Sequence, residues 1–134
     1  MNTLVYHTGA LGDFVTILPA ISLWRGLNPG ARIDYLGKRA HGQLGKAAGY
    51  FSEVLDIDQS RFASLFSEAL SNDLSSLVSS YDSCIVFADN ESPVLGHCAR
   101  LVHSVYHQPP FPDDQRHVVE RRVQGVEERS GAGA

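Results

Sequence analysis

A short segment near the N-terminus, His7-Thr8-Gly9-Ala10-Leu11-Gly12-Asp13, combines residue types that a ligand site needs. It follows the apolar run Leu4-Val5-Tyr6, which predicts a buried strand, and it precedes an apolar segment with helical spacing. Glycines permit tight turns and a close approach of a ligand to the main chain, and a helix N-terminus supplies free N–H groups. Because parallel α/β sheets bind ligands at the carboxyl ends of their strands, we expect these seven residues to line the site.

Two phosphate-binding motifs do not fit this segment. The dinucleotide fingerprint requires Gly-x-Gly-x-x-Gly, and only Gly9 and Gly12 are present. The phosphate loop of nucleotide hydrolases requires Gly-Lys-Ser/Thr, whereas Asp13 and Phe14 follow Gly12. A carboxylate at this place would also repel a phosphate. The segment therefore suits a neutral ligand rich in hydroxyl groups.

Asp13 has two interpretations. Aspartate is among the favoured N-cap residues, and spacing alone favours that structural role. The alternative is a functional role of its carboxylate in the ligand site. Spacing does not decide between the two.

Strand-like and helix-like segments alternate along the chain, which predicts an α/β fold with a Rossmann-like parallel sheet and flanking helices. The expected strands are residues 4–6, 33–36, 54–57 and 83–87, while residues 101–106 fit either a fifth strand or a helix. The expected helices are residues 14–27, 40–48, 60–70 (capped by Ser60), 73–81, 93–99 and 117–128. The tail at residues 129–134 is expected to be disordered.

The helix expected at residues 14–27 has two unusual features. Apolar residues occur on both of its sides, so we expect it to be buried against the sheet and against another element. Pro19 removes one backbone hydrogen bond, at a cost of about 3 kcal/mol in a straight helix. We therefore expect a kink, or an irregular first turn, around residues 15–19.

Other polar residues follow the expected strands. Lys38 and Arg39 follow the second strand, where they either bind acidic groups of a ligand or form a solvated surface pair. Asp89 and Asn90 follow the fourth strand, where they either face the same ligand or make an ordinary turn. No third ligand accompanies the pair formed by His103 and His107, so we expect no metal site.

The composition excludes several classes of protein. A net charge of -4 argues against a general nucleic-acid binder, which would carry a basic stripe. No apolar run approaches the roughly 18 residues of a membrane span, and the N-terminus lacks the features of a signal peptide. Cys84 and Cys98 fit two reduced, partly buried thiols, and we expect a cytoplasmic protein.

The segment Thr8-Gly9-Ala10-Leu11-Gly12-Asp13, with the apolar helix containing Thr16, Leu18 and Pro19, resembles glycosyltransferase family 9. That family includes the ADP-heptose:lipopolysaccharide heptosyltransferases. The resemblance continues through residues 29–36 and 50–55, and it returns at residues 109–112 and 117–120. It covers roughly the first 60 residues well and is loose between the other segments.

The resemblance implies a GT-B architecture, in which two Rossmann-like domains face each other across a cleft. Residues 1–128 then correspond to the N-terminal, acceptor-side domain, and the donor-binding C-terminal domain has no counterpart in this sequence. The reaction implied is an inverting transfer from a sugar nucleotide such as ADP-heptose, without an essential metal or other cofactor. Asp13 matches the aspartate that serves as general base in the family's heptosyltransferases.

The acceptor implied is the lipopolysaccharide core or another glycan. We expect the chain to be inactive alone, to associate peripherally with the inner membrane if its acceptor is membrane-bound, and to self-associate through an exposed domain-docking face. Two alternatives remain open: a non-catalytic Rossmann-like binding module and, less favoured, a small nucleotide-binding enzyme.

Overall fold

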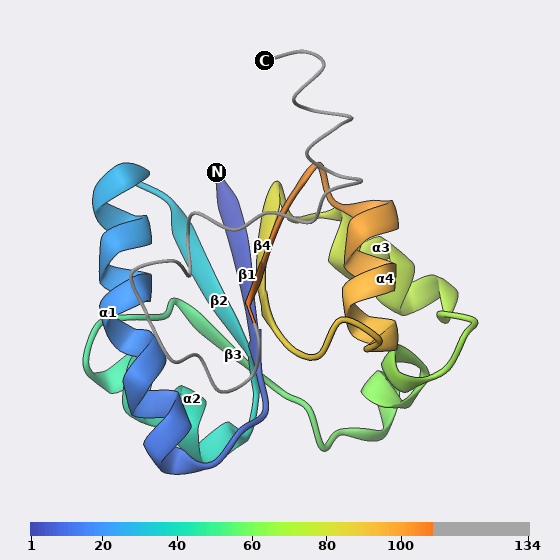
Figure 1. Ribbon diagram of the computed structural model, residues 1–134, viewed down its shortest axis with the longest axis horizontal. Helices are drawn as coiled ribbons and strands as arrows, with labels where there is room; N and C mark the ends of the chain where they lie inside the picture. Colours follow the sequence, from blue (N-terminus) through green and yellow to red (C-terminus); the bar gives the residue numbers. More distant parts are fainter. Residues whose placement is uncertain (109–134) are drawn as a thin grey trace.

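Five parallel strands pair in the order β3-β2-β1-β4-β5 in the computed structural model, which describes residues 1–108 (Figure 1). The strands are β1 (Asn2–His7), β2 (Arg32–Gly37), β3 (Glu53–Asp56), β4 (Ser83–Phe87) and β5 (Ser104–Gln108). The chain runs outward from β1 to β3 and then returns to the other side of β1 as β4. The direction of strand addition therefore reverses between β1 and β4, and such a switch point is where open α/β sheets bind ligands.

Helices cover both faces of the sheet (Figure 1). One face carries α1 (Leu11–Leu27) and α2 (Arg39–Ala47). The other carries the 3₁₀ helix η1 (Ser60–Phe66) with α3 (Asn72–Ser79) and α4 (Pro93–Leu101). This arrangement confirms the predicted α/β fold with a Rossmann-like parallel sheet and flanking helices.

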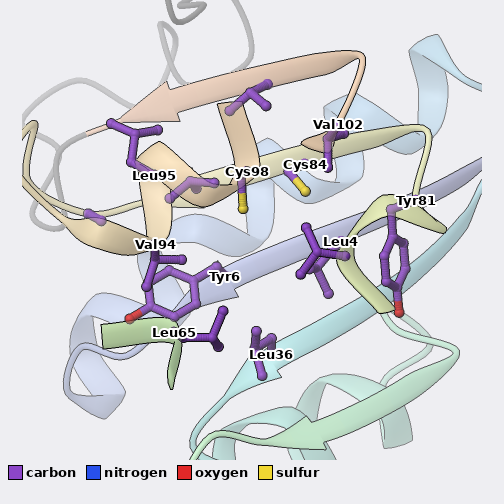
Figure 2. Packing of buried hydrophobic residues seen from close by; sticks show 14 of the residues in the cluster. Leu4, Tyr6, Leu36, Leu65, Tyr81, Cys84, Val94, Leu95, Cys98 and Val102 are labelled. Carbon is purple, nitrogen blue, oxygen red and sulfur yellow. The ribbon is translucent and has the colours of Figure 1, made fainter. Parts of the chain in front are cut away.

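The two faces bury separate hydrophobic clusters, and alternate residues of the central strand supply them. Leu4 and Tyr6 of β1 point into the cluster beneath η1, α3 and α4, which Figure 2 shows, whereas Val5 joins the cluster beneath α1. β4 divides in the same way, because Cys84 and Val86 belong to the first cluster and Ile85 to the second. Burial on both faces explains why these strands read as continuous apolar runs in the sequence.

The four predicted strands are confirmed. The sequence allowed either a strand or a helix at residues 101–106, and the structure has a fifth strand at residues 104–108. The prediction of an irregular first turn around Pro19 is wrong, since α1 is α-helical throughout Leu11–Leu27. Pro19 deprives only the carbonyl group of Val15 of its helical partner. Val15 is 54% exposed, so water can hydrogen-bond that carbonyl group instead.

The prediction of an α-helix at residues 60–70 is also wrong. Residues 60–66 form a 3₁₀ helix whose N-cap is Gln59, not Ser60. Phe62 and Leu65 are buried three residues apart, which matches the three-residue turn of a 3₁₀ helix. The hydroxyl group of Ser64 accepts a hydrogen bond from the main-chain N–H of Ser71 at 3.0 Å, and this bond folds the following residues back on the helix.

The second apolar side of α1 lies at the surface of the described part of the chain, contrary to the expected burial. Leu11, Val15, Leu23 and Leu27 are 46–64% exposed. None of the helices among residues 1–108 has the length and apolar character needed to cross a bilayer. The predicted helix at residues 117–128 and the predicted disordered tail lie outside the described residues.

Candidate functional site

The candidate site lies where β1 ends and α1 begins, beside the end of β4. Ala10 is the N-cap of α1 and makes no side-chain capping bond. The helix therefore starts at Leu11, three residues before the predicted start, so the second half of the predicted loop forms the first helical turn. The main-chain N–H groups of this first turn face the carboxyl end of the sheet, as is typical of anion-binding and polar-ligand sites.

Asp13 is the third residue of α1 and not its N-cap, so the capping interpretation is wrong. Its side chain is half-buried. Its main-chain oxygen accepts a hydrogen bond from the Thr16 hydroxyl group at 2.6 Å, but no described residue hydrogen-bonds its carboxylate. A carboxylate in the first turn is favoured by the helix dipole and is free here to bind a ligand hydroxyl group.

His7 is fully buried at the end of β1. Its ring centre lies 5.8 Å from that of Phe87, in an edge-to-face arrangement, and 6.3 Å from that of Phe14. Burial lowers the pKa of His7 to about 4, an effect opposed by the nearby Asp13 carboxylate and reinforced by His41 and Lys38. The imidazole is therefore neutral near pH 7, with one N–H donor and one acceptor nitrogen. Neither nitrogen has a hydrogen-bond partner among the described residues.

Gly9 separates His7 from Asp13. A Cβ atom at this position would stand 3.0 Å from both Cε1 and Nε2 of His7, and 3.2 Å from Cβ of Asp13. A Cβ at Gly12, in contrast, would meet nothing within 4 Å. A side chain at Gly9 would thus force His7 or Asp13 to shift, whereas Gly12 leaves open space beside the first turn of α1.

Lys38 and Arg39 have different surroundings although they are adjacent. Lys38 is the exposed N-cap of α2 and acts electrostatically on His7. Arg39 lines a hollow of about 330 Å³ beside β3, together with Gln43, Asp56 and Arg61. Of the two predicted basic residues, only Lys38 therefore acts on the group of residues around His7.

His41, on the first turn of α2, was not predicted as a site residue. Its ring stacks on Phe14 with 5.3 Å between the ring centres, and its buried Nδ1 atom has no partner in the described part of the chain. Burial lowers the pKa of His41, and Lys38 lowers it further. The only signal in the sequence was its place just after the second strand, which any helix-forming residue could occupy.

Asp89 and Asn90 follow β4, as predicted, and both are exposed. They line a surface hollow of about 620 Å³ with Glu91 and Ser92. No hydrogen bond or ion pair within residues 1–108 joins them to His7 or Asp13. They share the carboxyl edge of the sheet with the candidate site but form a separate polar hollow there.

Within the described residues, no three His, Cys, Asp or Glu side chains are placed to hold a metal ion. The helical spacing of His103 and His107 is not realised, because β5 begins between them. A ring nitrogen of His107 instead hydrogen-bonds the main-chain oxygen of Ala88 at 2.6 Å.

Solved structures share this fold, although no protein-family model and no curated protein matches the sequence. A glycosyl transferase of family 9 from Veillonella parvula DSM 2008 superposes with a TM-score of 0.53 at 19% identity, over 75% of this chain and 28% of that one. The E. coli heptosyltransferase WaaC with ADP superposes with a TM-score of 0.51 at 18% identity, over 96% of this chain and 46% of that one. The chain has a glycosyltransferase-like fold. It spans less than half the length of either of these proteins.

Proposed function

We propose that this chain is the acceptor-binding domain of an inverting, sugar-nucleotide-dependent glycosyltransferase of the heptosyltransferase type. Fold alone does not determine activity, so the proposal depends on the site. The observation that carries it is the Asp13 carboxylate, which lies on the first turn of α1 at the switch point of the sheet and has no described hydrogen-bond partner. The likeness of the fold to family 9 structures supports the same assignment.

The proposed chemistry is a displacement at the anomeric carbon of the donor sugar. The acceptor hydroxyl group attacks this carbon, and its proton passes to the Asp13 carboxylate as the new C–O bond forms. The bond to the nucleoside diphosphate breaks on the opposite face, so the configuration inverts and the electron pair leaves with the diphosphate. Asp13 then holds one proton, which it returns to solvent before the next cycle.

The residues around Asp13 have proposed roles in binding the acceptor. Residues 8–12 form the wall along which it approaches, and the open space at Gly12 admits it to the first turn of α1. Lys38 binds acidic groups of a lipopolysaccharide core or similar glycan. Arg39 and the Asp89–Asn90 pair line two separate hollows, where they contact more distant parts of the acceptor.

The GT-B architecture places the donor, such as ADP-heptose, in a second Rossmann-like domain. We therefore propose that these 134 residues alone bind an acceptor without transferring sugar. A lipid-anchored acceptor would bring the domain to the surface of the inner membrane, and the exposed apolar residues of α1 favour self-association.

Binding of lipid-free core oligosaccharides, followed by NMR with the isotope-labelled chain, tests this proposal. We expect signals of residues 7–13 and Lys38 to shift, and we expect Asp13→Ala to retain much of the binding because the base acts only during transfer. Asp73→Ala, which alters the first turn of α3, is the matched control. Absence of binding at this edge would contradict acceptor binding, and measurable transfer by the chain would contradict its proposed inactivity.

A further inference from the structure

Within residues 1–108, the buried imidazole of His7 has no hydrogen-bond partner at either ring nitrogen. Buried polar groups are nearly always hydrogen-bonded, and an unsatisfied one costs about 1–3 kcal/mol. Since His7 is enclosed by Phe14, Phe87 and the backbone at Gly9, water does not reach either nitrogen. Its partner must therefore come from a neighbouring side chain or a ligand.

Three titratable groups act on His7: Asp13 from α1, Lys38 at the start of α2, and His41 within α2. Lys38 can only donate a hydrogen bond. His41 stacks flat on Phe14 and also has an unpartnered nitrogen. Asp13 is the one group of the three with a negative charge, and a charged acceptor makes the stronger hydrogen bond.

Gly9 leaves space between the ring of His7 and the side chain of Asp13. The position that a Cβ would take lies 3.0 Å from Nε2 of His7 and 3.2 Å from Cβ of Asp13. The two side chains thus border the same space from opposite sides. Because both atoms lie this close to one point beside Gly9, a different χ1 rotamer of Asp13 would direct its carboxylate past the hydrogen atoms of Gly9 toward the imidazole N–H.

We propose that His7 is a positioning residue for Asp13, whose carboxylate accepts a hydrogen bond from His7 Nε2–H across the space that Gly9 leaves. This inference rests on the proposed function, since a positioned carboxylate matters only if Asp13 is the base. His7 holds one carboxylate oxygen and leaves the other directed at the acceptor hydroxyl group. The acceptor proton passes to that free oxygen, and His7 stays neutral throughout.

Long-range ¹H–¹⁵N NMR of the ¹⁵N-labelled 134-residue chain at pH 7 tests the pair without any substrate. We expect His7 to be the Nε2–H tautomer, with its imidazole N–H proton shifted downfield by the hydrogen bond to a carboxylate. Asp13→Ala should move that proton signal upfield, because no acceptor remains. Gly9→Ala should do the same, because a methyl group would separate the two side chains. Asp58→Ala, which alters an exposed carboxylate after β3, should leave the signal unchanged.

Two results would overturn the inference. One is an Nδ1–H tautomer in the wild-type chain, which is read without any substitution and so decides even if a variant fails to fold. The other is an unchanged chemical shift of the imidazole N–H proton in a folded Asp13→Ala chain. The outcomes also separate the two proposals. A downfield N–H that depends on Asp13, without oligosaccharide binding, supports the His7–Asp13 pair and contradicts the proposed function. Oligosaccharide binding without that N–H signal supports the function and contradicts the pair.

Discussion

The hydroxyl group of Tyr35 donates a hydrogen bond of 2.9 Å to the main-chain oxygen of His7, and thereby ties β2 to the last residue of β1. Gly37 lies against the same oxygen, since a Cβ there would stand 2.1 Å from it and 2.6 Å from the Tyr35 hydroxyl oxygen. Burial raises the pKa of Tyr35, so its hydroxyl group remains a donor across the physiological range. The first residue of the site is therefore held by its neighbouring strand through the main chain.

Gly37→Ala should destabilise the protein by about 3 kcal/mol, the upper end of the usual cost of overpacking a core. The reason is that the new methyl group would meet a main-chain oxygen, which cannot move without breaking the pairing of β1 with β2. Urea unfolding measures the loss. Gly26→Ala is the control, because a Cβ in that helical position meets nothing within 4 Å. If both variants unfold at the wild-type urea concentration, the packing argument at Gly37 is wrong.

The stability of the protein should depend on pH through His7. Its pKa of about 4 in the folded chain lies below the ordinary value of 6.5, so the unfolded chain binds the proton more tightly. This contribution is fully present above pH 6.5 and is lost as the pH falls from 6.5 to 4, by about 3 kcal/mol in total. His7→Gln removes the titrating group. Between pH 7 and pH 4, the free energy of unfolding of this variant should therefore fall by about 3 kcal/mol less than that of the wild type. The exposed His103→Gln serves as control, and identical pH profiles for wild type and His7→Gln would refute the prediction.

The sequence predicted the sheet well because strands buried on both faces must be apolar, as β1 and β4 are. It failed at residues 60–70, where an apolar spacing of three and four residues suits both helix types and serine hydroxyl bonds decide the outcome. It also predicted a site role for Asp13 by resemblance but could not exclude capping, because any early aspartate fits an N-cap. Only the structure shows that Ala10 is the N-cap.

His41 and the packing role of Gly9 were beyond sequence reasoning for a different reason. Both depend on contacts between elements: His41 of α2 stacks on Phe14 of α1, and Gly9 accommodates the ring of His7. Residue type and local spacing do not indicate which residues of different elements come into contact. The surroundings of Lys38 and Arg39 likewise differ because Lys38 is the exposed N-cap of α2 near His7, whereas Arg39 lines a hollow beside β3.

Tyr81→Phe should destabilise the protein by about 1–3 kcal/mol. The carboxylate of Asp34 is nearly buried and accepts hydrogen bonds from the Tyr81 hydroxyl group at 2.8 Å and from Arg32 at 3.2 Å. Without the hydroxyl group, a buried carboxylate oxygen loses its closest donor. Thermal unfolding measures the change. Tyr50→Phe, at a half-buried tyrosine, is the matched control, and an equal effect of the two variants would argue against a specific role for the bond.

Cys84 and Cys98 should resist thiol reagents as long as the protein is folded. Both are buried rather than partly exposed, and they lie in the same cluster between β4 and α4 (Figure 2). A hydrogen bond with Cys98, together with burial, raises the pKa of Cys84, so little reactive thiolate forms at neutral pH. Labelling with iodoacetamide, followed by mass spectrometry, should modify neither thiol in buffer and both in denaturant. Rapid modification in buffer would show that this core opens.

The exposed apolar residues of α1 should cause self-association at high concentration. Leu11, Val15, Leu23 and Leu27 recur at every fourth residue and form a ridge along the helix, with the exposed Pro19 between them. A ridge of this kind favours burial against a second copy. The double substitution Val15→Glu with Leu23→Glu should raise the dissociation constant measured by analytical ultracentrifugation at least about tenfold, since each tenfold step needs only 1.4 kcal/mol. Ser22→Glu adds a charge at an exposed polar position of the same helix and should have little effect. A wild-type chain that sediments as a monomer at every concentration would show that the ridge does not pair with itself.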